Sequence, residues 1–389
     1  MLRSRTGEAE MIASTVEELT DEYDHDYWRE CVAAERRPTE LWAELGDLGF
    51  LGITVPEAYG GEGLGIREQA ALVETLAANA VTLPFLVLSS GMAPIPIAAH
   101  GSEELKERFL PRIARGETRF CFAITEPEAG TNSFKIRTRA DREGDEYVID
   151  GRKTYISGVE SADYIQLVAR TTPYSAVKDD DPRVGGTVLV VPTDAPGIEL
   201  EELDTAITDT TSQYEVHFDG VRVPVENRIG EEDRGFFHMF DALNPERILL
   251  AAQAAGYGQF VLERAIEYAQ EREVFDAPIG SHQAIQHPLV ETTVELELGA
   301  LAMDQAIDAF DGDRAEAGAY ANMAKYAVTE AADRAVDVAI QTLGGNGFSR
   351  DFDVITLRNN IRLFRVAPVS NEMVLNHLAE RLLGLSRSY

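Results

Sequence analysis

Residues 122–131 read Phe122-Ala123-Ile124-Thr125-Glu126-Pro127-Glu128-Ala129-Gly130-Thr131. The first four residues favour a β-strand, and the proline and glycine that follow predict a turn at its end. Further along, Lys153-Thr154-Tyr155-Ile156-Ser157-Gly158 predicts a second strand that ends with an aromatic residue beside a hydroxyl. Two such ends can hold a flat heterocycle, because an aromatic ring covers one face while hydroxyl and amide groups bond its polar edge. The spacing alone also fits two ordinary strand-to-turn junctions.

Three blocks of different texture surround these motifs. Residues 1–119 carry apolar residues at helical spacing, and residues 232–389 form long alanine-rich helical patterns typical of a four-helix bundle. Residues 120–231 contain short β-rich runs separated by turn clusters, which predicts an antiparallel sheet packed as a barrel or sandwich. We therefore expect an α+β protein, mainly α, with an N-terminal all-α domain (1–119), a middle β domain (120–231) and a C-terminal four-helix bundle (232–389).

Individual elements follow from the same patterns. The glycine-rich residues 55–65 predict a tight connector with positive φ rather than a phosphate loop, because no βαβ unit surrounds them. Asn244-Pro245 predicts a helix start, with the asparagine as cap and the proline in the first turn. Residues 171–186 are polar, with aspartates at 179–181, and predict an exposed loop. The expected strands are 120–125, 135–140, 147–149, 165–170, 187–191 and 214–218, and the later helices are 244–270, 285–310, 314–343 and 370–385.

The charge balance narrows the class of partner. The chain has 389 residues, 67 Asp plus Glu against 35 Lys plus Arg, and a formal net charge of -32, while 44% hydrophobic residues are typical of a globular protein. Nucleic acids and anionic membranes attract clustered cations, so we expect neither as a partner. Self-repulsion at this charge is relieved by concentrated salt. The composition therefore predicts a halophilic protein from a high-salt cytoplasm.

Cysteine and histidine usage exclude two further classes of site. Cys31 and Cys121 have no CxxC spacing and cannot build a disulfide framework, so we expect buried thiols. The seven histidines are scattered, and none forms an HExxH or paired pattern, so no metal site is expected. The charged residues 1–10 lack the apolar region of a secretion signal, and residues 79–99 contain prolines that argue against a membrane span. We expect a soluble, cytoplasmic protein.

Taken in order along nearly the whole chain, the motifs resemble the acyl-CoA dehydrogenase family. The resemblance implies a helical domain, a β domain and a four-helix bundle, assembled as a homotetramer (a dimer of dimers). It also implies FAD held between domains and a site completed by a neighbouring subunit. The motifs that carry the resemblance are residues 55–65, Ala123-Ile124-Thr125-Glu126-Pro127 with Ala129-Gly130, residues 153–157, Arg272 with Phe275, Gln341 with Gly344-Gly345-Asn346-Gly347, and the tail from Arg358.

The family pattern assigns cofactor roles residue by residue. By resemblance, Phe122, Ile124 and Thr125 contact the flavin ring, Gly130 and Thr131 lie near the pyrophosphate and acyl-CoA, Tyr155 shields the flavin, and Ser157 lies beside flavin N5. Arg272 and Phe275 match the pair that meets FAD from the partner subunit, although this chain has Asp276 where the family usually has Gly. The remaining implied FAD contacts are Gln283, Gln341, Gly344, Gly345, Ser370 and Glu372.

Several of these residues also have a purely structural interpretation. Tyr155 and Ser157 fit a packed strand aromatic and a turn hydroxyl. Gly344 fits the C-cap of a helix, and Ser370 fits the N-cap of the last helix. Arg272 fits a cation at the C-terminus of a helix. These interpretations do not exclude contact with FAD.

The catalytic base is the point at which the chain departs from most of the family. Many members carry a glutamate in the tail, and the corresponding position here is Pro368, which cannot accept a proton. A minority branch carries the base on a bundle helix immediately before an arginine. That site here reads Asn244-Pro245-Glu246-Arg247, so we expect Glu246 as base, with Asn244 and Arg247 binding substrate. The alternative is that Glu246 only complements a helix dipole from the first turn.

The expected function is FAD-dependent α,β-dehydrogenation of an acyl-CoA thioester to a 2,3-enoyl-CoA. The resemblance implies that the electrons pass to an electron-transfer flavoprotein. One alternative keeps the fold but is a flavin oxidase, a nitroalkane-type oxidase or an enoyl-CoA-reducing enzyme. Another is a catalytically silent oligomer that binds FAD or acyl-CoA, which the proline at the usual base position favours. The acyl chain length is not predicted.

Overall fold

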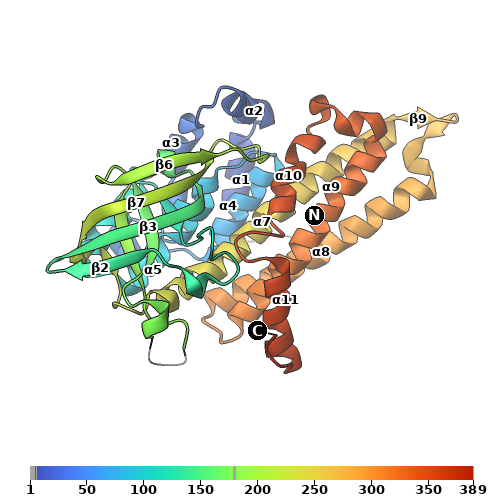
Figure 1. Ribbon diagram of the computed structural model, residues 1–389. Coiled ribbons are helices and arrows are strands. Elements are labelled where there is room, and N and C mark those ends of the chain that lie inside the picture. The colour runs from blue at the N-terminus through green and yellow to red at the C-terminus, as the bar shows by residue number, and fades with distance from the viewer. Residues whose placement is uncertain (1–4, 6, 178–180, 389) are drawn as a thin grey trace.

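The computed structural model describes residue 5, residues 7–177 and residues 181–388. Residues 1–4 and 6 of the charged stretch 1–10, and residues 178–180 of the expected exposed loop, lie outside this range. Figure 1 shows a β-sheet flanked by helices on one side of the molecule and a bundle of long helices that extends away from it. A mainly helical chain with a central β block is confirmed.

Helices form the first block. They are α1 (Glu8–Leu19), α2 (His25–Ala33), α3 (Thr39–Asp47), α4 (Ile66–Ala78), a π-helical turn (Leu86–Met92), α5 (Pro94–His100) and α6 (Glu103–Ala114). Ser102 is the N-cap of α6, because its side chain accepts a hydrogen bond from Leu105 N at 3.2 Å. Gly60 and Gly63 in the connector before α4 have φ values of 78° and 63°, which confirms the need for positive φ there.

The middle block is one sheet. Its strands are β1 (Phe120–Ala123), β2 (Arg139–Glu143), β3 (Glu146–Ser157), β4 (Tyr164–Arg170), β5 (Gly186–Pro192), β6 (Ile198–Leu203), β7 (Gln213–Pro224) and β8 (Arg228–Ile229). The strand order is β6-β7-β3-β2-β4-β5-β8, and β1 pairs with β4. Most pairs are antiparallel, as expected, but β1 and β4 run parallel, as do β2 and β4 at a single residue pair. The parallel pair places the end of β1 beside the middle of β4.

The third block is the bundle. It contains α7 (Gly235–Glu271), α8 (Gln283–Asp311), α9 (Ala317–Leu343), α10 (Val354–Leu363) and α11 (Asn371–Leu383), with a small hairpin of β9 (Glu273–Val274) and β10 (Ala277–Pro278) between α7 and α8. Gly256 allows α7 to approach the first block closely, since a Cβ there would lie 2.3 Å from Glu74 O. One hydrophobic core contains residues of all three blocks, including Leu72, Ile149 and Val261.

Several expected element boundaries are wrong. The strands expected at 147–149 and 214–218 extend to β3 (Glu146–Ser157) and β7 (Gln213–Pro224), and two elements begin elsewhere than expected. α7 does not begin at Asn244-Pro245: it begins at Gly235, and Pro245 lies inside it. Phe236, Met239 and Ala242 are buried at helical spacing, and their packing carries the helix through the proline. The strand expected at residues 135–140 begins only at Arg139. Ser133–Lys135 form a 3₁₀ turn, and the backbone N–H groups of Arg137 and Thr138 donate to the Glu126 carboxylate instead of to a neighbouring strand.

Candidate functional site

The ends of β1 and β3 lie side by side. The backbone N–H of Thr154 donates to the carbonyl of Thr125 at 2.9 Å, so the loop after β1 is held against the last residues of β3. The ammonium group of Lys153 donates to the carbonyl of Ile124 at 2.9 Å. The two motifs that opened the sequence argument therefore form one wall, with Phe122, Ile124 and Thr125 partly exposed on it.

A buried ion pair supports this wall from behind. Lys153 Nζ lies 2.8 Å from Glu126 Oε1, and the two side chains are 0% and 3% exposed. Glu126 also accepts hydrogen bonds from the backbone N–H groups of Arg137 and Thr138. Burial alone raises the pKa of Glu126, but Lys153 and these N–H groups outweigh it and hold the pKa below its usual value. The fully partnered pair fixes the two strand ends relative to each other.

Tyr155 projects from this wall in an unusual backbone conformation. Tyr155 has a φ of 56° and is 65% exposed. The pairing of β3 with β7 shifts in register between Lys153 and Ile156. A positive φ at a bulky residue costs of order 1–3 kcal/mol and clusters at functional sites. The exposed ring is not the packed strand aromatic that the sequence also permitted.

Ser157 ends β3 in a polar pair with β7. Its Oγ exchanges hydrogen bonds with the side-chain amide of Gln213, at 3.0 Å to Oε1 and 2.8 Å to Nε2. Gly158 follows with a φ of 68°, and its N–H donates to the carbonyl of Ser212 at 3.0 Å. Gln213 is a contact that the sequence analysis missed, because nothing in the local pattern links two residues from distant strands.

The loop that follows Glu126 is exposed to solvent. Gly130 and Thr131 lie in the exposed loop after Glu126, where a Cβ on Gly130 would meet no atom within 4 Å. The loop closes on itself through the hydrogen bonds between Glu126 and Ala129. These two residues therefore leave room for a group at the edge of the wall.

A second polar group lies within α7. Glu246 is 5% exposed, and its Oε2 is buried without a hydrogen-bond partner among the described residues. Burial raises the pKa of Glu246 to about 7, and the charge of Arg247 opposes this rise. Arg247 is 8% exposed, and its Nη1 donates to Asn244 Oδ1 at 2.8 Å. Glu246 lies about three turns into the helix, so complementing the helix dipole from the first turn is excluded.

The tail that carries Pro368 is tied to α9. Lys325 is buried, and its ammonium group donates to the Val369 carbonyl and to Asn371 Oδ1, each at 2.7 Å. Ser370 accepts from Met373 N and is the N-cap of α11, as the structural interpretation expects. Glu372 is exposed, and its pKa is lowered by hydrogen bonds from the Glu372 backbone N–H and from the Ser370 side chain. The sequence analysis missed Lys325, whose partners are remote in sequence.

The remaining predicted residues lie at the far end of the bundle. Arg272 directly follows α7, and Phe275 in the β9–β10 hairpin is 90% exposed. In Figure 1 this hairpin forms the tip of the extended arm, at the opposite end of the molecule from the sheet. Within one chain the structure therefore does not bring Arg272 or Phe275 to the wall formed by β1 and β3. The exposed residues Gln283, Gln341, Gly344 and Gly345 begin α8 or end α9.

The β9–β10 hairpin and the end of α9 both contain residues with positive φ. Phe275 and Asp276 have φ values of 55° and 65°, so Asp276 adopts the left-handed conformation that the family glycine suggests, and Asp tolerates it better than most residues. Gly344 is the C-cap of α9, with φ 61° and ψ −128°. The side chain of the nearby Asn346 donates to Tyr268 OH at 3.1 Å, which holds this glycine turn against the last turn of α7.

Three expected absences can be compared with the described part of the chain. There, no group of three or more His, Cys, Asp or Glu side chains is arranged to hold a metal ion. The same residues include no helix that is long and apolar enough to cross a membrane. Cys31 and Cys121 are both free and buried, as expected.

Known proteins match the chain over its full length. Residues 6–117, 121–221 and 233–383 match the N-terminal, middle and C-terminal domains of acyl-CoA dehydrogenases. The chain is 41% identical to acyl-CoA dehydrogenase FadE12 of Mycobacterium bovis, covering 98% of this chain and 97% of that protein. It is 33% identical to glutaryl-CoA dehydrogenase of Desulfococcus multivorans, covering 83% and 81%. The crystal structure of acyl-CoA dehydrogenase from Geobacillus kaustophilus has a TM-score of 0.92 at 27% identity, covering 98% and 100%. The chain belongs to the acyl-CoA dehydrogenase family, whose members are FAD-dependent oxidoreductases that act on CH–CH bonds.

Proposed function

We propose that this protein removes the α-proton and the β-hydride of an acyl-CoA thioester to form a 2,3-enoyl-CoA. The observation that carries the proposal is Glu246, a carboxyl buried within α7, with one oxygen unpartnered and a pKa raised to about 7. Such a group accepts a proton near neutral pH more readily than an exposed carboxylate does. The vacant base position at Pro368 leaves Glu246 as the candidate.

The residues of the β1–β3 wall suit FAD. Tyr155 presents an exposed ring from a fixed backbone, Ser157 presents a hydroxyl oriented by Gln213, and the Lys153–Glu126 pair keeps the loop at Ile124 and Thr125 in place. We propose that Phe122, Ile124, Thr125, Tyr155 and Ser157 hold the flavin, with Gly130 and Thr131 toward the pyrophosphate and acyl-CoA. When bound, FAD supplies the acceptor for the hydride from the β-carbon.

The chain itself supplies the proton acceptor and its orientation. We propose that the Glu246 carboxylate takes the α-proton of the substrate. Arg247, held by Asn244 at 2.8 Å, lies next to it in sequence and fixes a positive charge in the same buried region. That charge limits how far the pKa of Glu246 rises, which keeps a fraction of the carboxyl ionised at neutral pH. Asn244 and Arg247 are proposed to contact the substrate as well.

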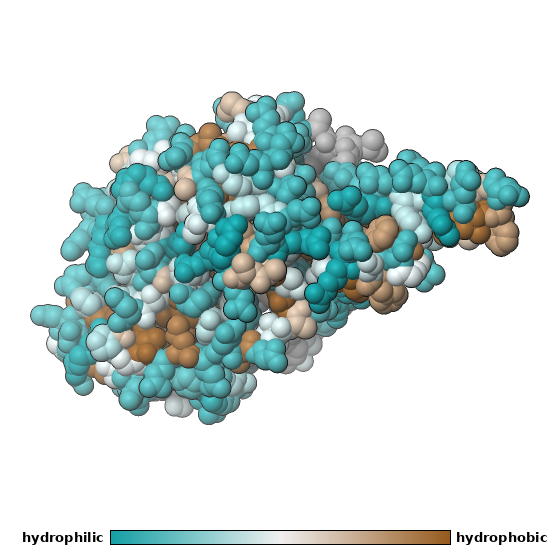
Figure 2. Space-filling view, turned by 90° about the horizontal axis from the view of Figure 1, so that it is seen from above, coloured by the Kyte–Doolittle hydropathy of each residue, from teal (hydrophilic) through white to brown (hydrophobic). Residues whose placement is uncertain are grey.

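We propose that the site is completed by a second copy of the chain in a tetramer built as a dimer of dimers. Arg272, Phe275, Gln283, Gln341, Gly344 and Gly345 lie toward the exposed end of the bundle, and Arg suits a diphosphate because its planar fork donates two hydrogen bonds. Figure 2 shows apolar residues at the tip of the arm. Ser370 and Glu372, which cap α11, are proposed as further FAD contacts.

An apolar stripe on α8 supports this assembly. Val290, Val294, Leu298 and Leu301 are 50–61% exposed and recur at helical spacing. Leu298→Glu is expected to dissociate the assembly and release FAD together, because a charge replaces an apolar contact. Ser14→Glu adds the same charge to an exposed position of α1 and is the control. Light scattering with flavin absorbance measures both, and an unchanged mass in Leu298→Glu contradicts the stripe as an interface.

We propose that the three blocks act as the domains 1–119, 120–231 and 232–389. We further propose that the protein passes its electrons to an electron-transfer flavoprotein. The electron partner rests on the family alone.

We also propose that the protein works in a cytoplasm of high salt, and the net charge of -32 supports this. The same negative charge opposes the approach of anionic CoA at low salt, so KM is expected to fall as salt screens the charges.

Anaerobic flavin bleaching by a panel of acyl-CoA thioesters tests the proposed reaction. Straight, branched and ring-bearing acyl groups are included, since the chain length is not predicted. The proposal expects bleaching by at least one thioester, slow reoxidation in air, and fast reoxidation by an electron-transfer flavoprotein. Rapid oxygen consumption favours a flavin oxidase, and bound FAD that no thioester bleaches favours a silent binding protein.

A further inference from the structure

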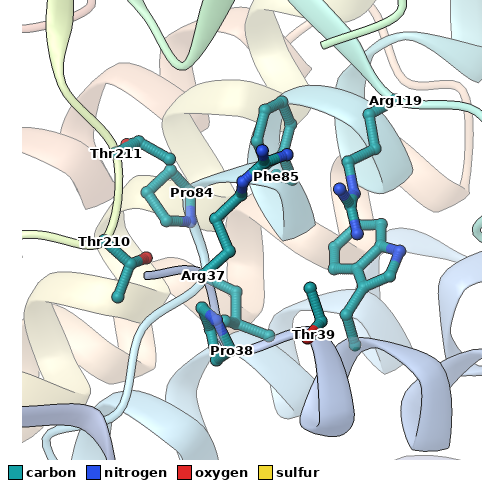
Figure 3. A pocket seen from close by; sticks show the side chains of 10 residues that line it. Arg37, Pro38, Thr39, Pro84, Phe85, Arg119, Thr210 and Thr211 are labelled. Carbon is teal, nitrogen blue, oxygen red and sulfur yellow. The ribbon is translucent and has the colours of Figure 1, made fainter. Parts of the chain in front are cut away.

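A surface pocket is lined by none of the residues assigned to FAD or substrate. It is a shallow depression, open to solvent, between the segment before α3, the segment before the π-helical turn, the start of β1 and the loop before β7. About 310 Å³ of empty space lies in and above it, and its cavity volume is about 20 Å³, room for about one water molecule, so a ligand there sits largely at the surface. Figure 3 shows the side chains that converge on it. Its lining residues are Arg37, Pro38, Thr39, Trp42, Leu83, Pro84, Phe85, Arg119, Thr210 and Thr211.

Two guanidinium groups from distant parts of the chain face this pocket. Arg119 stacks on the Trp42 ring at 5.0 Å and on the Phe85 ring at 6.0 Å, which fixes the plane of its guanidinium group. Burial and the nearby charge of Arg37 lower the pKa of Arg119. Both arginines line the same pocket, so two like charges share it at the cost of mutual repulsion. An anion between them removes that cost.

Neither arginine has a carboxylate partner within the described residues. The carboxylate of Asp163 accepts a hydrogen bond from the Arg119 backbone N–H at 2.8 Å, and its charge opposes the lowering of the Arg119 pKa, but it makes no ion pair with the Arg119 side chain. The charge of Arg37 lowers the pKa of Glu160, but it is the smallest of the influences on that pKa. By contrast, the neighbouring Arg36 pairs with Glu40 at 3.1 Å. Arg37 and Arg119 thus keep free donors in a strongly acidic protein.

The rest of the lining suits a small acid with an apolar body. Pro38, Leu83, Pro84 and Phe85 provide apolar walls, and Thr39, Thr210 and Thr211 also line the pocket. The hydroxyls of Thr39 and Thr210 already donate to Glu40 Oε2 and Asp209 Oδ1, which leaves the hydroxyl of Thr211 and the two arginines as the donors for a ligand. Hydroxyl donors and arginine forks are the groups that bind carboxylate and phosphate oxygens. The pocket combines both with aromatic surface.

The pocket also backs onto the end of β3. A Cβ on Gly158 would lie 2.9 Å from Phe85 Cζ and 3.4 Å from Thr211 Cγ2, so two of the lining residues pack directly on this glycine. Gly158 follows Ser157, and its N–H is bonded to Ser212 O next to Thr211. Phe85 and Thr211 therefore lie between the pocket and the segment that carries Ser157.

We propose that this pocket is a binding site for the carboxylate or phosphate group of a small apolar acid, held between Arg37 and Arg119. It is separate from the acyl-CoA site and acts as a second ligand site behind the β3 end. The proposal does not depend on the proposed reaction, because binding can be measured without turnover.

Titration of the FAD-loaded protein with benzoate, and separately with inorganic phosphate, tests the proposal at constant ionic strength set with potassium chloride. The readout is tryptophan fluorescence, since the chain has two tryptophans and Trp42 lines the pocket. We expect a saturable change with at least one of the two acids in the wild type, and its absence in Trp42→Phe. Saturation by benzoate alone assigns a carboxylate on an aromatic body, and saturation by phosphate alone assigns a phosphate.

Arginine variants locate the binding. Arg37→Gln and Arg119→Gln are each expected to weaken binding about tenfold, because each removes a charged hydrogen-bond donor. Arg36→Gln is the matched control and is expected to bind like the wild type. Arg37 is exposed, so its variant serves if Arg119→Gln fails to fold. The proposal is overturned if neither acid binds saturably, or if Arg37→Gln binds as tightly as the wild type.

Discussion

At the scale of single residues, Glu246 shows both what sequence supplies and what it lacks. The motif of a glutamate before an arginine identifies the residue, but the sequence leaves a helix-dipole role open. That alternative rested on a helix start at Asn244-Pro245, and the helix in fact begins at Gly235. The Lys153–Glu126 pair and the Ser157–Gln213 pair were not assigned, because their partners meet only in the folded sheet.

The raised pKa of Glu246 has a consequence for stability. The folded protein holds this proton up to about pH 7, whereas the unfolded chain releases it near 4.5, so stability falls as pH rises between these values. Above pH 7 the wild type carries a cost on the order of 3 kcal/mol. Glu246→Gln lacks this cost. Its gain in the free energy of unfolding, measured by urea denaturation without acyl-CoA, is expected to be roughly 2 kcal/mol larger at about pH 8 than at about pH 5.

Glu267→Gln controls for loss of a charge on the same helix. Glu267 is exposed on α7, so its replacement is expected to change stability equally at both pH values. If the gain from Glu246→Gln is independent of pH, the carboxyl is not held in its neutral form by burial. A destabilisation that grows with pH would mean that the ionised form is stabilised instead.

At the scale of elements, the sequence located most helices and strands but not their ends. Long amphipathic patterns identified α8 and α9 to within three residues at either end. β6 was missed because its residues Glu199, Glu201 and Glu202 obscure the alternation of an edge strand, and it pairs only with β7. Apolar residues at helical spacing over residues 28–48 belong to two helices rather than one, since Pro38 lies at the start of α3. Local sequence patterns do not show which strands pair or where a helix is interrupted, because long-range contacts decide both.

The end of α9 provides an element-scale prediction. Gly344 has φ 61° and ψ −128°, a conformation essentially restricted to glycine, whereas Gly345 has no positive φ. A Cβ at either residue meets no atom within 4 Å, so the two positions differ in backbone conformation rather than in space. Gly344→Ala is expected to lower the free energy of unfolding by about 1–3 kcal/mol.

Gly345→Ala is the matched control and is expected to leave stability nearly unchanged. Both variants are measured by urea denaturation with circular dichroism. Equal effects of the two substitutions would show that the left-handed turn at Gly344 is not required to end α9.

At the scale of the whole molecule, the sequence predicted the three blocks and their order, and the family matches confirm the fold class. It did not predict the parallel pairing of β1 with β4, which depends on long-range contacts. Nor does one chain bring Arg272 and Phe275 to the β1–β3 wall, a separation that is visible in Figure 1. The acidic surface is a property of the whole chain rather than of any site.

Salt is expected to stabilise the protein. A net charge of -32 destabilises the compact state by self-repulsion, and the Debye length falls from about 10 Å near 0.1 M salt to about 3 Å near 1 M. The free energy of unfolding is therefore expected to rise between about 0.1 M and about 2 M potassium chloride. Urea denaturation at each salt concentration measures this. A flat or falling curve would remove the support for a high-salt habitat.

The most direct measurement of the central claim is anaerobic stopped-flow flavin bleaching by Glu246→Gln with the best thioester of the panel. The account predicts that this variant keeps FAD bound but loses substrate-driven bleaching, because glutamine cannot accept the α-proton. Glu267→Gln should bleach at the wild-type rate. Undiminished bleaching in Glu246→Gln would contradict the assignment of Glu246 as the base.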